Sequence, residues 1–179
     1  MSTSQAAVDV EGSEKSGKAS ARARALAERI EQGARELEAF AQGLSDADWK
    51  TPMVTGTDRR PVGVIVHHVA TMYPIEVDVA KAVARGEAVD VTWEAVADIN
   101  GKHSAEHGGV TKSAAIDLLR KNSRAAAEAV RAFSDEELDR AAPFGLSYGA
   151  PMTAQFVVED HAMRHSWHHL ARIRKALNR

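Results

Sequence analysis

The sequence contains no cysteine, which excludes disulfide bonds, thiolate catalysis and thiolate metal sites together. Any metal ion must therefore be held by nitrogen or oxygen ligands. Aromatic residues are also scarce, at 5% of the chain. A basic excess is missing as well, because the net charge is −2. This charge argues against a nucleic-acid binder, which would normally carry many more lysines and arginines than acidic residues.

Long apolar runs are absent too. No stretch reaches the roughly 18 apolar residues that a membrane-spanning helix needs, and residues 1–19 lack the apolar core of a signal peptide. We therefore expect a cytoplasmic protein with no membrane partner. Residues 1–19 are polar and without apolar periodicity, so we expect a disordered leader there. Residues 20–179 are then expected to form a single domain.

Helix-forming patterns dominate the rest of the chain. Alanine, the best helix former, is abundant, and no strand pattern is convincing. Apolar residues recur at helical spacing in four long segments and one shorter one: 20–43, 61–85, 113–133 and 153–177, with 92–107 as the shorter segment. The sequence therefore predicts an all-α fold, a bundle of four long helices with a short extra helical segment.

Local signals refine these boundaries. Pro61 can start the second long helix, and Gly86 can stop it. Pro74 lies inside this helix and predicts either a bend or a break into two pieces. We favour the bend, because the apolar stripe continues in register past the proline. Ser45 and Asp48 resemble a capping box that opens a short turn after the first helix.

Histidine placement is the strongest functional signal. Four of the eight histidines lie in one stretch of the last helix: His161, His165, His168 and His169. At about 100° per residue, His165 and His169 stand about 40° apart and are the pair best aimed at the interior. A pair at positions i and i+4 can present two ring nitrogens to one ion.

A third ligand must come from another helix. The second long helix offers His67 and His68. His68 belongs to the inward apolar stripe, whereas His67 falls on a more polar side with Thr71 and Asp78. Three imidazoles with an open position for water form the pattern of a catalytic metal site. The alternatives from the residues alone are histidines that only pack in the core, or a solvated surface cluster.

Two segments resemble a known family. PVGVIVHHVA, which contains His68, and RHSWHHLARIR, which contains His165 and His169, resemble the DinB-like (DinB/YfiT-like) superfamily of metalloenzymes. LSDADW and WEAVADIN, the latter with Asn100, resemble further family features. The likeness extends over about residues 20–177. Arg172 stands where the family's H-x-x-x-H-x-x-Q-I ending commonly has glutamine.

The resemblance implies a four-helix bundle with up-down-down-up connections, a three-histidine metal site and frequent dimerisation. Carried over to this sequence, the metal ligands are His68, His165 and His169. His161, one turn before His165, is a reserve ligand or a hydrogen-bonding partner of a ligand. The cation expected is divalent, with zinc first and nickel, iron or manganese as alternatives, because three imidazoles suit most of them.

Family activities include thiol-dependent S-transferases that use bacillithiol or mycothiol, and a mycothiol-dependent maleylpyruvate isomerase whose N-terminal-type domain is related. We expect a metal-dependent S-transferase that imports a low-molecular-weight thiol to attack a small-molecule electrophile. The isomerase is the weaker assignment, because its later helix carries a Glu with a His where this chain has His165 and His169.

Other functions stay open. The same metal site could activate water in a hydrolase or amidase. Glu76, two turns beyond His68, and His161 are the candidate catalytic bases for either reaction. The bundle could instead be a non-catalytic metal-binding module of a stress response, in which His161 would close the coordination as a fourth ligand. It could also be an interaction domain without a metal.

Overall fold

The computed structural model describes residues 20–54 and 58–179, so the expected leader at 1–19 lies outside the described residues. The described chain is mostly helical. In chain order its elements are α1 (Ala21–Gln42), α2 (Asp46–Lys50), α3 (Val62–Ala84), α4 (Trp93–Glu106), α5 (Lys112–Arg131), α6 (Asp135–Asp139), β1 (Ala141–Pro143), the 3₁₀ turn η1 (Gly145–Ser147), β2 (Pro151–Thr153), α7 (Ala154–Val157), the π-helical η2 (Val158–Met163) and α8 (Arg164–Ala176).

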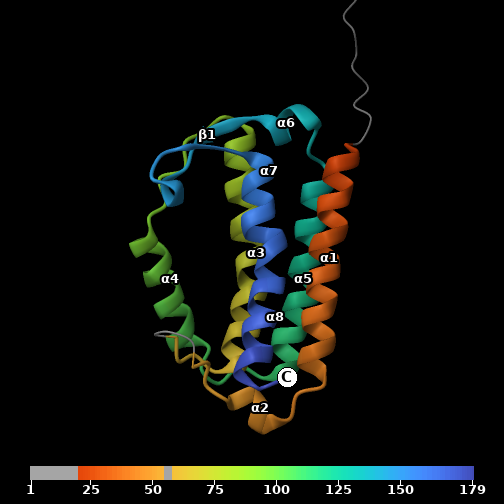
Figure 1. The fold of residues 1–179 in the computed structure, drawn as a ribbon, viewed down its shortest axis with the longest axis vertical. Helices are drawn as coiled ribbons and strands as arrows, with labels where there is room; N and C mark the ends of the chain where they lie inside the picture. Colours follow the sequence, from red (N-terminus) through yellow and green to blue (C-terminus); the bar gives the residue numbers. More distant parts are fainter. Residues whose placement is uncertain (1–19, 55–57) are drawn as a thin grey trace, which may run out of the picture.

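Four rods form the bundle. They are α1, α3, α5 and the continuous run of α7, η2 and α8, here called the last rod (Figure 1). The last rod runs in the same direction as α1, whereas α3 and α5 both run in the opposite direction. The connection is therefore up-down-down-up, as the family resemblance implies. Because α3 and α5 are parallel neighbours, the chain must return between them, and α4 forms most of that return.

Local chemistry explains the helix ends. The Ser20 hydroxyl accepts a hydrogen bond from Ala23 N–H at 3.0 Å and caps α1. Ser45 and Asp48 form the predicted capping box that opens α2. The helix α3 continues through Pro74, so the alternative of two shorter pieces is wrong.

A small hairpin differs from the prediction that no strand forms. β1 pairs antiparallel with β2, from Ala141 opposite Thr153 to Pro143 opposite Pro151. Strands of three residues are too short for apolar alternation to mark them in the sequence. The hairpin is fastened to the segment before α4, because Gly145 N–H donates to the Val89 carbonyl at 2.8 Å.

The core fills the space between the four rods and leaves α4 outside it. Small and aliphatic side chains of α1, α3, α5 and the last rod are buried there. In α4 the single buried side chain is that of His103, and Figure 1 shows α4 standing apart from the rods. Within the described ranges, no helix combines the length and apolar character needed to cross a bilayer.

Candidate metal centre

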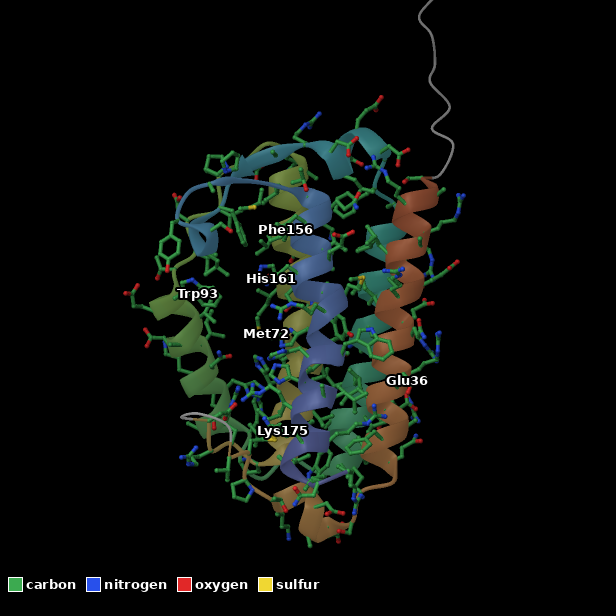
Figure 2. The ribbon with its side chains drawn as sticks, viewed as in Figure 1. Glu36, Met72, Trp93, Phe156, His161 and Lys175 are labelled. Carbon is green, nitrogen blue, oxygen red and sulfur yellow. The ribbon has the colours of Figure 1, made fainter. Side chains whose placement is uncertain are left out.

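A cavity of about 400 Å³ separates α4 from the bundle. Its walls come from α3, α4, the last rod and the hairpin. Met72, Trp93 and His161, which Figure 2 labels, line it from three of these elements. Ile75 and Trp93 are 42% and 55% exposed, because they face this hollow and not the core between the rods. The cavity therefore has an apolar wall that a small organic molecule can contact.

Three histidines meet at the wall of this cavity. His68 of α3 faces His165 and His169 of α8, and one nitrogen of each ring lies within 4.8 Å of the others. Nε2 of His165 is 3.2 Å from Nε2 of His68. Two imidazole nitrogens bound to one tetrahedral zinc ion are separated by about 3.3 Å. The structure therefore brings together the three residues that the sequence suggested as ligands, at a spacing that suits one cation.

Burial keeps two of these rings neutral. His68 and His169 are each 5% exposed. Burial is the main cause that lowers the pKa of both well below the ordinary 6.5, and the proximity of the His165 ring adds to it. Both imidazoles are therefore uncharged at neutral pH, and their lone pairs are free to bind a cation.

Glu76 orients the third ring. Its Oε1 lies 2.5 Å from Nδ1 of His165, and its side chain is buried. Because a carboxylate only accepts, Nδ1 of His165 carries the proton, and the lone pair stays on Nε2, which faces His68. Carboxylate partners of this kind fix the tautomer of metal-binding histidines. The sequence suggested Glu76 as a catalytic base, and the structure places it behind His165.

His161 lies apart from the three rings. It is carried by η2, and its ring packs edge-on against Phe144 at 5.6 Å between centroids. It lines the cavity and does not share the cluster of His68, His165 and His169. Burial lowers its pKa. Single π-helical turns inside α-helices are frequent at functional sites, and here the π-helical turn immediately precedes the helix that carries His165 and His169.

Arg172 is hydrogen-bonded to a carboxylate, and no hydrogen bond links it to a histidine among the described residues. Its Nη2 lies 3.0 Å from Oδ2 of Asp58, which also pairs with Arg60 at 2.9 Å. Although burial opposes it, these hydrogen bonds lower the pKa of Asp58 to about 2. Among the described residues, Nδ1 of His169 is buried without a hydrogen-bond partner.

A second histidine cluster was missed from the sequence. His67 of α3 meets His103 and His107 at the end of α4, again with nitrogens within 4.8 Å. The available signal was the i, i+4 spacing of His103 and His107, which repeats that of His165 and His169. His168 is exposed and belongs to neither cluster.

Comparison with known proteins agrees with this architecture. YfiT from Bacillus subtilis, described as a probable metal-dependent hydrolase with an unusual four-helix bundle topology, superposes with a TM-score of 0.69 at 18% identity, over 87% of this chain and 86% of that one. A mycothiol-dependent maleylpyruvate isomerase superposes with a TM-score of 0.62 at 15% identity, over 84% of this chain and 60% of that one. No curated protein sequence gives a significant match. The family model of the DinB superfamily matches residues 29–173, so the chain belongs to the DinB superfamily.

Proposed function

We propose that the protein is an enzyme in which His68, His165 and His169 hold a divalent cation, with zinc as the first choice. The observation that carries this proposal is the convergence of three ring nitrogens beside a cavity of small-molecule size. Three protein ligands leave a coordination position for a reactant. The place of His161 in the cavity wall, apart from the cluster, supports such an open site over a closed structural one.

The reaction we propose is transfer of a low-molecular-weight thiol, of the mycothiol or bacillithiol type, to a small electrophile. The chain has no cysteine, so the nucleophile must be a cosubstrate. When bound, a divalent cation would lower the pKa of a thiol that coordinates it. Glu76 is already hydrogen-bonded to His165, and thiol transfer does not require it as a base. The mycothiol dependence of the similar isomerase supports a thiol cosubstrate.

The cavity indicates how the reactants would be held. Met72, Ile75 and Ile99 provide apolar contact area. Oδ1 of Asn100 and Nη1 of Arg60 belong to lining residues and are buried without a hydrogen-bond partner in the part of the chain that the structure describes. A buried unpaired acceptor or donor is unfavourable, so each is available to a substrate group. We infer a substrate with an N–H or O–H donor near Asn100 and a carbonyl or anionic group near Arg60.

Metal-dependent hydrolysis is the second candidate. It is favoured by the likeness to the Bacillus subtilis protein, which spans most of both chains. In that case the cation would increase the acidity of a water molecule, and His161, which lines the cavity outside the cluster, would be the candidate base. We also propose a cytoplasmic location, which the sequence suggests, and a homodimer, which follows from the family resemblance.

Metal content tests the first step. We would purify the full chain without a histidine tag and measure bound metal by ICP-MS, beside a His165→Ala/His169→Ala variant. We expect the double variant to lose the metal ion that this cluster holds. His168→Ala is the matched control, since His168 lies on the same helix outside both clusters. A double variant that keeps all its metal would overturn the proposed site.

Activity tests the second step. Zinc-loaded protein would be incubated with mycothiol, bacillithiol or cysteine and the electrophile monobromobimane, and in parallel with nitrophenyl esters and nitroanilides. The thiol displaces bromide from monobromobimane spontaneously, so thiol transfer predicts a rate above that of the protein-free reaction. This acceleration should need zinc and be lost in His165→Ala/His169→Ala. Hydrolysis of the esters or anilides without any thiol would move the assignment to the second candidate.

A further inference from the structure

We propose that His67, His103 and His107 form a second site for a divalent transition metal, which fastens helix α4 to the bundle. This site is separate from the cluster of His68, His165 and His169, although His67 and His68 are neighbours on α3. The proposal concerns a different set of ligands and a different task, so it does not depend on the proposed reaction.

The geometry of the three rings carries the inference. Nδ1 of His67 lies 2.9 Å from Nε2 of His103. The centroid of the His107 ring lies 4.2 Å from that of His67 and 4.6 Å from that of His103. One nitrogen from each ring falls within 4.8 Å of the other two. This is the convergence that a single cation requires, and three imidazoles suit zinc, copper or nickel.

The helices explain how the ligands arrive. His103 and His107 stand one turn apart at the end of α4, so that both rings leave the helix on the same side. The backbone there is ordered by the hydrogen bond from His107 N–H to the His103 carbonyl at 3.0 Å. His67 lies on the side of α3 that faces away from the core, as its partial exposure indicates. The pair on α4 therefore meets a single ring on α3, which is the arrangement of many three-histidine sites.

The position of α4 indicates a structural role for the second site. His103 is the single buried side chain of α4, so apolar packing holds this helix only weakly. Trp93, Ile99 and Asn100 of the same helix form one wall of the cavity. A cation shared by α3 and α4 would hold that wall in place. The two clusters also touch, since the rings of His68 and His103 are 5.5 Å apart between centroids.

Metal stoichiometry tests the site directly. Chelator-treated full-length protein would be titrated with zinc in a calorimeter, with ICP-MS after dialysis. The two clusters predict two zinc ions per chain in the unchanged protein and one in either His103→Ala/His107→Ala or His165→Ala/His169→Ala. Combining all four substitutions should abolish binding, whereas His168→Ala should keep both ions. A single zinc ion in the unchanged protein, lost only with His165 and His169, would overturn the proposal.

A second readout tests the fastening of α4. Hydrogen exchange would be measured in the His165→Ala/His169→Ala protein, which retains only the proposed second site. Zinc should slow exchange of the α4 amides at least several-fold, and His107→Gln should remove this protection. His107 is only partly buried, so this variant should fold, which circular dichroism would verify. Exchange in α4 that zinc leaves unchanged would refute the role of the site even if zinc binds.

Discussion

Glu76 and His165 come from different helices and meet in a buried hydrogen bond of 2.5 Å between Oε1 and Nδ1. The bond joins α3 to α8, the two helices that supply the ligands of the proposed metal centre. It directs Nε2 of His165 toward His68. A buried carboxylate in this position can act through the ring it orients, so we propose Glu76 as a positioning residue.

Replacing Glu76 by glutamine tests this role. Glu76→Gln keeps the shape of the side chain and removes its charge. The hydrogen bond that fixes the proton on Nδ1 of His165 therefore becomes weaker. We expect zinc affinity at the first site to fall by about 10- to 100-fold, the usual effect of losing such a partner. Competition with a fluorescent chelator measures it. Asp78→Asn, an exposed change on the same helix, should leave the affinity unaltered, and equal affinities in both variants would contradict the role of Glu76.

His161→Ala distinguishes an open site from a closed one. His161 lines the cavity outside the three-ring cluster. We therefore expect unchanged metal content and a higher KM for the substrate, because a contact in the cavity wall is lost. ICP-MS and steady-state kinetics measure the two quantities. If metal is lost instead, His161 is a fourth ligand, and the site is a closed, structural metal site and not a catalytic one.

The rods, and the convergence of His68, His165 and His169, could be predicted because both follow from local periodicity. Apolar spacing marks each helix within its own segment, and His165 with His169 is an i, i+4 pair on one helix. The apolar stripe that contains His68 predicts an inward ring, and the ring is buried.

What the sequence could not provide is the placement of α4. Its helical pattern was visible, but nothing local indicates that it stands off the bundle and brings His103 and His107 to His67. A helical wheel put His67 on a polar side and carried no information on which element covers that side. For the same reason the sequence indicates only a candidate base at Glu76, because its partner His165 lies 89 residues away in sequence.

Acid should destabilise the metal-free protein. The pKa values of His68 and His169 are lowered mainly by burial, whereas the unfolded state titrates near 6.5. Below pH 6.5 the unfolded chain therefore binds more protons, and the stabilisation present at higher pH is lost as the pH falls. Each buried histidine should contribute on the order of 1 kcal/mol per pH unit.

Urea unfolding between pH 7.5 and 5 measures this slope. His169→Gln should reduce it, because one buried titrating group is removed. His168→Gln, at an exposed position on the same helix, should change it less. A slope that is the same in the unchanged protein and in His169→Gln would mean that other groups govern the acid sensitivity.

Tyr73 and Ser166 provide a second buried link between α3 and α8. Their hydroxyl oxygens are 2.7 Å apart, and both residues are fully buried. Tyr73→Phe leaves the Ser166 hydroxyl without its partner, and Ser166→Ala leaves that of Tyr73. Each single change should cost about 1–3 kcal/mol of unfolding free energy, because the remaining hydroxyl is buried and unpaired.

The double variant separates this bond from simple packing. Tyr73→Phe/Ser166→Ala removes both hydroxyls, so its loss should be smaller than the sum of the single losses by about 1 kcal/mol or more. Urea unfolding of the four proteins gives the coupling energy. Because the bond lies between the helices that carry His68 and His165, all three variants should bind zinc more weakly than the unchanged protein. Additive losses with equal zinc affinities would show that the two helices are held in register without this bond.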